Sequence, residues 1–188
     1  MKIALIVIAV IVVLLIGVFG WAMGERNALV VEQQAVKAQW AQVDVALQRR
    51  ADLIPNLVQT VKGYAKQEVT VFTNIANARA ALGGARTPQE KIQANGQLDS
   101  ALSRLLVIVE NYPQLKSDRN FQELQFELAG TENRIAIERR KYNEAVQKYN
   151  TDIQLFPRNI VAGLFGFHTD NAYFQTDAGA RTAPKVEF

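Results

Sequence analysis

Residues 3–24 read IALIVIAVIVVLLIGVFGWAMG, an apolar run that contains no charged side chain. About 20 helical residues at roughly 1.5 Å each cover about 30 Å, which is the thickness of a bilayer's hydrocarbon core. Trp21 lies near the far end of the run, where its amphipathic ring suits the headgroup boundary. The run therefore predicts a single transmembrane helix at the N-terminus, over residues 1–24.

A cleaved signal peptide is the alternative interpretation of the same run. Lys2 would supply its positive charge, and Gly20-Trp21-Ala22 has the small-x-small pattern of a cleavage site. The run is longer than the usual apolar region of about 7–15 residues, which favours a retained span. Because Lys2 lies beside the N-terminus, we expect the N-terminus inside and the following domain outside the membrane.

The rest of the chain has the pattern of long amphipathic helices with sparse Gly and Pro. Helices are predicted over residues 25–50, 53–82, 88–111 and 118–156, followed by a short apolar segment at 158–165. Short connectors between long helices favour antiparallel neighbours. The predicted fold is all-α: an N-terminal transmembrane helix, an elongated antiparallel bundle of about four long helices over residues 25–165, and an extended C-terminal tail over residues 166–188.

Local signals predict where these helices begin and end. Arg49-Arg50-Ala51-Asp52 predicts a helix C-terminus whose positive charges complement the helix dipole, followed by an N-cap at Asp52 with Pro55 in the first turn. Thr87-Pro88-Gln89-Glu90 predicts a capping box. No breaker stronger than Gly24 separates the span from the first bundle helix, so the two are expected to be continuous.

The last long helix carries a repeat of seven residues. The residues at this spacing are Phe121, Leu128, Ile135, Tyr142, Tyr149 and Phe156. Such a repeat predicts a coiled-coil-like seam against neighbouring helices. Within it, Tyr142-Asn143 and Tyr149-Asn150 repeat a polar pair. These residues either satisfy buried polar groups and fix helix register, or form a polar recognition strip for a partner.

Few residue patterns in the sequence are typical of catalysis or cofactor binding. There is no cysteine, and the single histidine, His168, has no second metal ligand near it. No phosphate-binding glycine loop follows a strand, and no serine lies in a nucleophile elbow. The carboxylates Glu132, Glu138 and Asp152 are interpreted as solvated partners of arginines such as Arg139 and Arg140. We therefore expect no enzyme activity, no catalytic or metal site, no cofactor and no small-molecule substrate.

Charge and the C-terminus bear on possible partners. A formal net charge of +3 with both signs interspersed does not favour nucleic acid. The ending Val186-Glu187-Phe188 presents an apolar residue, a spacer and an apolar C-terminal carboxylate. PDZ domains bind such ends by strand addition. A tail recognised by a PDZ-type protein is therefore one binding hypothesis.

Several of these segments together resemble the LemA family of bacterial membrane proteins. They are RRADLIPNLV at 49–58, VKGYA at 61–65, ENRIA at 132–136, Arg140, Tyr142-Asn143, Tyr149-Asn150, Phe156-Pro157, GAR at 179–181 and PKVEF at 184–188. The resemblance implies a single N-terminal span and an antiparallel bundle, with no established enzymatic activity or ligand. It also implies an association with cell-envelope stress, membrane proteases and membrane organisation.

Two functions are expected from this sequence. The first is a structural or adaptor protein of the bacterial inner membrane, whose bundle acts through helix–helix contacts with copies of itself or with other membrane proteins. The alternative is a binding module whose tail, Val186-Glu187-Phe188, is recognised by a PDZ-type envelope protease or chaperone.

Overall fold

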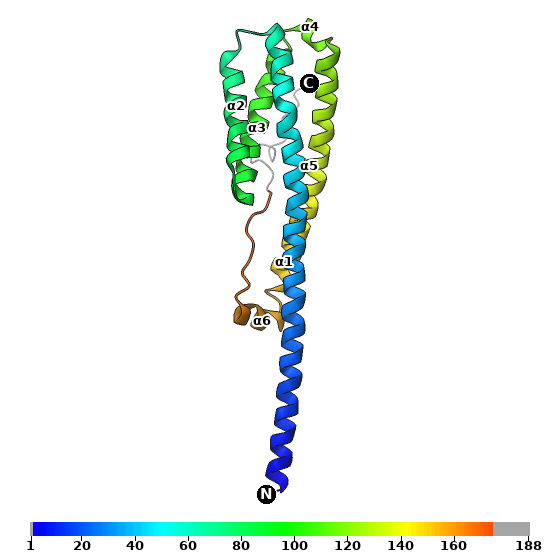
Figure 1. Ribbon diagram of the computed structural model, residues 1–188, viewed down its shortest axis with the longest axis vertical. Helices are drawn as coiled ribbons and strands as arrows, with labels where there is room; N and C mark the ends of the chain where they lie inside the picture. Colours follow the sequence, from blue (N-terminus) through cyan, green and yellow to red (C-terminus); the bar gives the residue numbers. More distant parts are fainter. Residues whose placement is uncertain (1, 175–188) are drawn as a thin grey trace, which may run out of the picture. The chain divides into compact units, whose positions relative to one another are not determined.

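A computed structural model of the protein describes residues 2–174, and every regular element within that range is an α-helix (Figure 1). In chain order the helices are α1 (Lys2–Tyr64), α2 (Val69–Gly84), α3 (Pro88–Val109), α4 (Pro113–Lys116), α5 (Arg119–Asp152) and α6 (Arg158–Phe165). The predicted all-α fold is confirmed. Most of the predicted tail, including Val186-Glu187-Phe188, lies outside the described residues.

Helix α1 is a single helix of 63 residues that begins in the apolar run and ends at Tyr64. Its N-terminal part is long and apolar enough to cross a membrane, and the side chains of that stretch are not buried against other described residues. A helix that is apolar on all sides is stable in water only when it is buried, so this surface suits lipid. The predicted continuity of the apolar run with the following helix is confirmed.

The predicted break at residues 50–53 is wrong, because α1 continues through Pro55. A proline inside a helix has no N–H for the carbonyl four residues earlier, which here belongs to Ala51. Arg79 of α2 supplies the missing donor, since its Nε donates to the Ala51 oxygen at 2.9 Å. Asp52 is therefore not an N-cap, and its Oδ1 accepts a hydrogen bond from Gln48 Nε2 at 2.8 Å. The chain turns at residues 65–68 instead.

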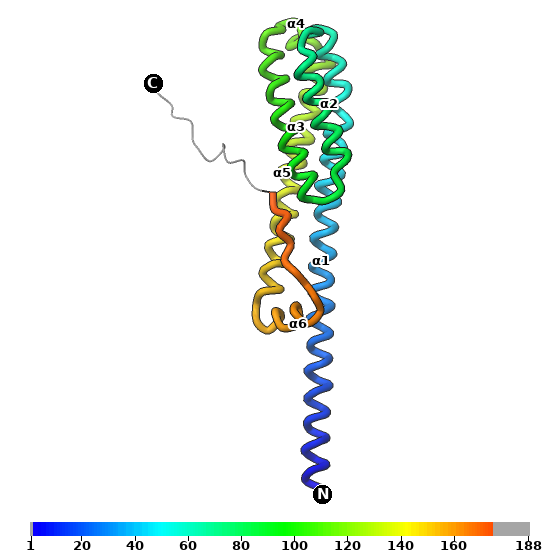
Figure 2. The backbone as a smooth tube through the Cα atoms, turned by 90° about the vertical axis from the view of Figure 1, so that its left-hand side faces the viewer, coloured from blue at the N-terminus to red at the C-terminus, as the bar shows by residue number. Residues whose placement is uncertain are grey.

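The chain divides into two compact units. The bundle unit comprises residues 40–141 with 172–174, and so contains the end of α1, helices α2 to α4 and most of α5. In this unit α1, α2, α3 and α5 lie side by side and alternate in direction (Figures 1 and 2). Its core consists of Val43, Leu47, Ile54, Leu57, Val61, Phe72, Ile75, Leu82, Leu98, Leu105, Leu115, Phe121 and Ile135.

The capping box at the start of α3 is confirmed. Thr87 Oγ1 accepts from the Glu90 N–H at 3.2 Å, and Glu90 Oε2 accepts from the Thr87 N–H at 3.3 Å. Glu90 Oε2 also accepts from the Arg86 N–H at 2.7 Å. Because these backbone donors favour the carboxylate, they lower the pKa of Glu90.

The span unit comprises residues 2–39 with 142–171, and so contains the apolar run, the end of α5 and helix α6. Helix α5 ends at Asp152, before the predicted end at residue 156. Residues before a proline disfavour helical backbone, and Pro157 lies close behind this end. Tyr142 and Tyr149 of the seven-residue repeat are buried, whereas Phe156 is 78% exposed. Phe156 therefore does not belong to the seam.

Candidate functional site

Arg50 is the most buried arginine in the core of the bundle unit, with a side chain only 9% exposed. Its Nη1 lies 2.6 Å from Asp99 Oδ1 of α3 and 2.6 Å from Glu132 Oε2 of α5. One side chain on α1 thereby joins three helices. The prediction that Arg50 complements a helix C-terminus is wrong, because α1 continues for a further 14 residues to Tyr64. Arg49, by contrast, points to the surface and pairs with Glu127 at 3.1 Å.

Asp99 is held in this cluster by one neighbour on its own helix and one on α5. Asn95 Nδ2 donates to Asp99 Oδ2 at 2.9 Å, and Arg139 Nη2 of α5 lies 3.9 Å from the same oxygen. Burial raises the pKa of Asp99, and the nearby arginines offset this effect in part. The two arginines and two carboxylates, Arg50, Arg139, Asp99 and Glu132, balance in formal charge. We call these four residues the Arg50 cluster.

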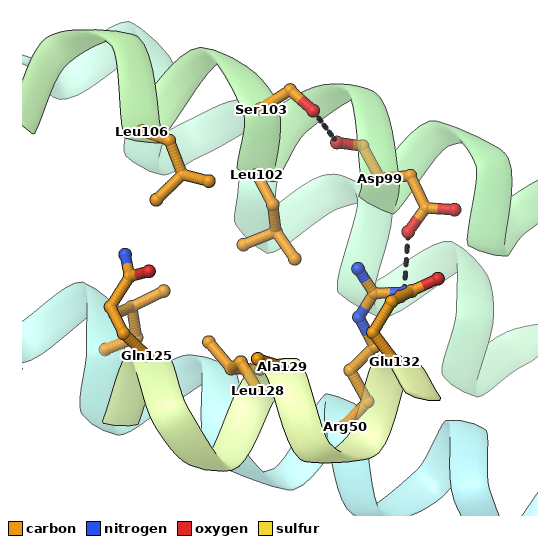
Figure 3. Close-up of a pocket in the computed structure, with 10 residues that line it drawn as sticks. Arg50, Asp99, Leu102, Ser103, Leu106, Gln125, Leu128, Ala129 and Glu132 are labelled. Carbon is orange, nitrogen blue, oxygen red and sulfur yellow. Dashed lines mark hydrogen bonds and ion pairs between the residues drawn. The ribbon is translucent and has the colours of Figure 1, made fainter. Parts of the chain in front are cut away.

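A groove of about 360 Å³ opens beside the Arg50 cluster. Figure 3 shows Leu102 and Leu106 of α3 facing Leu128 of α5, with Arg50 and the two carboxylates at one end. Ser103, a polar residue along the groove, is engaged within its own helix, because its Oγ donates to the Asp99 backbone oxygen at 2.9 Å. The groove thus combines an apolar wall with an internally neutralised ion cluster, which is an arrangement for packing helices together.

Two carboxylates that the sequence predicts to be solvated, Glu138 and Asp152, are largely buried. Glu138 has a side chain only 2% exposed, with Arg134 Nε at 3.0 Å and Lys141 Nζ at 3.4 Å from its Oε1. Asp152 is mostly buried and pairs with Lys148 and Arg158. Glu138 is therefore paired within its own helix as predicted, although its partners are Arg134 and Lys141. The side chains of Glu138 and Asp152 contribute to packing as well as to charge.

The polar pairs of the seven-residue repeat lie in the span unit. Tyr142, Tyr149 and Asn150 are buried, and Asn143 is half-buried. Tyr149 Oη donates to the His168 backbone oxygen at 3.0 Å. Asn150 bonds twice to Asp170: its Nδ2 donates to the backbone oxygen at 2.7 Å, and its Oδ1 accepts from the N–H at 2.8 Å.

This geometry joins Tyr149-Asn150 to residues 168–170, a segment that no pattern in the sequence connects with the pair. An asparagine side chain carries a donor and an acceptor, so it can bond to both backbone groups of an extended residue. Residues 168–170 pass close to α5, and both backbone groups of Asp170 bond to Asn150. Whether the four residues also fix helix register or contact a partner stays a prediction, although their burial leaves little of Tyr142 or Tyr149 for a partner.

Replacing Asn150 with alanine is expected to release Asp170 from α5 and to cost about 2 kcal/mol, because two hydrogen bonds that each contribute about 1 kcal/mol are lost. Hydrogen exchange at the Asp170 amide measures the effect directly, because that N–H is the one Asn150 accepts. Asn143→Ala on the same helix is the matched control. Equal exchange rates at Asp170 in the two variants would contradict the expected result.

A second ion cluster, the basal cluster, connects α1, α5 and α6 within the span unit. Its members are Glu25, Glu32, Lys148, Asp152 and Arg158. Arg158 Nε lies 2.7 Å from Glu25 Oε2, and its Nη1 lies 3.0 Å from Asp152 Oδ2. Burial raises the pKa of Glu32, whereas the hydrogen bond from Lys148 lowers the pKa of Asp152. No local sequence pattern connects residues so far apart in the chain.

An apolar helix that continues into an antiparallel bundle, stabilised by apolar packing and buried ion pairs, defines a membrane-associated helical-bundle protein. The LemA family model matches residues 39–188, and the chain belongs to the LemA family. The family resemblance read from the sequence is confirmed.

The chain is similar in sequence to proteins named MamQ and to a protein named LemA. The chain is 26% identical over 179 residues to the magnetosome proteins MamQ 1 and MamQ 2 of Paramagnetospirillum magneticum, covering 81% of this chain and 66% of each relative. It is 25% identical over 152 residues to Protein LemA of Metamycoplasma hominis, covering 80% of this chain and 69% of that protein. The chain thus spans slightly less than two thirds of the length of the MamQ proteins.

Proposed function

We propose that this protein is a structural or adaptor protein of the bacterial inner membrane, with its bundle on the outer side, and that it has no catalytic activity. It acts through helix–helix contacts with copies of itself or with other membrane proteins. Membership of the LemA family and the apolar start of α1 support the membrane part of the proposal. Membrane organisation and envelope stress, the associations that the family implies, are roles such an adaptor would serve.

The observation that carries the proposal is a group of exposed apolar side chains on the bundle unit. Leu106 and Val107 of α3 and Phe126 of α5 are exposed, and Phe126 is 82% exposed. Leu106 and Phe126 line one groove, together with Val109 and Phe121. Exposed apolar side chains that line one groove, as Leu106 and Phe126 do, are typical of a protein interaction site, because their exposure to water is unfavourable. We call these exposed residues the bundle patch.

Replacing Phe126 with glutamine tests the bundle patch. The side chain is mostly in solvent, so folding stability is expected to stay within about 0.5 kcal/mol of the wild type. Loss of its contact area is expected to weaken association of the detergent-extracted protein, measured as molar mass by light scattering, and to reduce the partners that copurify in mild detergent. Val69→Gln replaces an exposed apolar residue of α2 and is the matched control. Unchanged mass and unchanged partners in Phe126→Gln would contradict the adaptor proposal.

The alternative proposal is that a PDZ-type envelope protease or chaperone binds the C-terminus. Val186-Glu187-Phe188 supports it through the chemistry of the free carboxylate and two apolar side chains. Deleting residues 179–188 separates the two proposals. Association through the bundle patch is expected to survive the deletion and to be lost in Phe126→Gln, whereas tail recognition is expected to show the reverse pattern.

A further inference from the structure

Helix α6 of the span unit has one buried face and one exposed apolar face. Arg158, Val161, Ala162 and Phe165 follow the spacing of one helix face, and Val161 and Ala162 are buried. Ile160 and Leu164, four residues apart, lie on another face and are exposed, Leu164 to 77%. Leu155 and Phe156, in the turn before α6, are also exposed. Four large apolar side chains therefore point away from the protein within one short segment.

Two contacts hold α6 beside the end of the apolar run. Arg158 Nε lies 2.7 Å from Glu25 Oε2, and the Arg26 guanidinium lies 5.4 Å from the centre of the Phe165 ring. Glu25 and Arg26 come directly after Gly24, the last residue of the run. Figures 1 and 2 both show α6 lying across α1 instead of along it. The exposed apolar side chains of α6 therefore lie about where a membrane's hydrocarbon core gives way to its headgroups.

We propose that residues 155–165 form a second membrane contact, in which Leu155, Phe156, Ile160 and Leu164 enter the lipid interface beside α1. The proposal rests on α1 being inserted in the membrane. Amphipathic helices with Phe and Leu on one face bind in this way, parallel to the bilayer surface.

Lipid is the occupant that these observations favour over a protein partner. Helix α6, which carries the exposed face, contacts α1 at Glu25 and Arg26, directly after the exposed apolar run ends at Gly24. The neighbouring charges Glu25, Asp152 and Arg158 are already paired in the basal cluster, and Arg26 lies over the Phe165 ring, so approaching the interface leaves no ion pair of the cluster broken. The apolar run of α1 and residues 155–165 would then hold the span unit to the membrane at two places. Together they would fix its orientation relative to the membrane surface.

The absence of cysteine from the chain allows a direct test on the full-length protein. Leu164→Cys and Ile160→Cys each receive an environment-sensitive fluorophore, and the protein is reconstituted in vesicles of phosphatidylcholine and phosphatidylglycerol in equal parts. Gln147→Cys, exposed on α5 in the same unit, is the matched control outside the proposed contact. Val10→Cys, within the apolar run, reports independently whether α1 is inserted.

Quenching by lipids that carry a nitroxide near the headgroup is expected to be several-fold stronger for labels at 160 and 164 than for the label at 147. The label at 10 is expected to be quenched best by a nitroxide near the end of the acyl chain. If the label at 10 is quenched and those at 160 and 164 match the label at 147, the inference is wrong while insertion of α1 stands. Labels at 160 and 164 that are shielded from aqueous iodide but not quenched by lipid would indicate a protein partner and would equally overturn it. Failure of quenching at 10 would refute insertion, and with it this inference.

Discussion

Arg50→Ala is expected to destabilise the protein by about 3 kcal/mol, because it leaves Asp99 and Glu132 without the cation they share. Breaking a buried ion pair typically costs about 3–5 kcal/mol, and the lower end applies here since both carboxylates keep some contact with solvent. Chemical denaturation of the detergent-solubilised protein, followed by the helical circular dichroism signal, measures this cost.

Arg49→Ala is the matched control, because the neighbouring arginine makes a single surface pair with Glu127. Exposed pairs of this kind contribute at most about 1 kcal/mol. Comparable losses for Arg49→Ala and Arg50→Ala would show that the Arg50 cluster contributes no more than a surface pair does.

The same cluster predicts a rescue. Arg50→Met combined with Asp99→Asn and Glu132→Gln removes the buried cation together with both carboxylates that pair with it, so neither carboxylate is left without a cation. Arg139, whose side chain is 26% exposed, loses only a partner 3.9 Å away. Replacing a buried ion network by apolar residues of similar volume is often neutral or stabilising, and the amides Asn and Gln keep the size of the carboxylates without their charge. We expect the triple variant to recover most of the stability that Arg50→Ala loses; a triple variant as unstable as Arg50→Ala would contradict the electrostatic explanation.

Acidification gives a further check on Arg50→Ala. The pKa of Asp99 is already raised by burial, and removing Arg50 takes away a charge that lowers it. An acid whose pKa is higher in the folded than in the unfolded protein binds more protons when folded, so stability rises as pH falls through the folded pKa. The deficit of Arg50→Ala is therefore expected to shrink as pH falls from 7 toward the pKa of Asp99.

The features that the sequence predicts correctly depend on residues close together in the chain. The apolar run needs only its own composition, and the capping box needs only Thr87 and Glu90, three residues apart. The Arg50 cluster could not be found in this way. Its partners come from α3 and α5, and the surrounding residues make Arg50 look like an ordinary positive charge at a helix end.

Pro55 is a second position at which the local sequence does not reveal a tertiary contact. Proline normally ends or kinks a helix, and the prediction of a boundary near residue 52 follows that rule. The rule fails because Arg79 of α2 donates a hydrogen bond to the Ala51 carbonyl, which lacks the N–H of residue 55. Arg79 lies 28 residues beyond Ala51, and nothing in its local sequence indicates that it donates to that carbonyl. A helix interior at residues 50–55 is thus accompanied by a tertiary contact that the local sequence does not reveal.

Arg79→Ala is accordingly expected to cost about 1–2 kcal/mol, because it leaves the buried Ala51 carbonyl without a donor. In a Pro55→Ala background the amide of residue 55 can donate to that carbonyl, so Arg79→Ala should cost about 0.5 kcal/mol or less there. The two substitutions are therefore expected to be non-additive by about 1 kcal/mol in a double-mutant cycle.

Unfolding free energies of the four proteins from denaturant titrations supply the cycle. Arg86→Ala, an exposed arginine beyond the end of α2, is the control and should cost the same small amount with either residue at position 55. If Arg79→Ala costs the same in both backgrounds, the guanidinium stabilises α2 in some other way. A cost that depends on Pro55 would instead mean that a side chain from α2 compensates for the N–H that the proline lacks within α1.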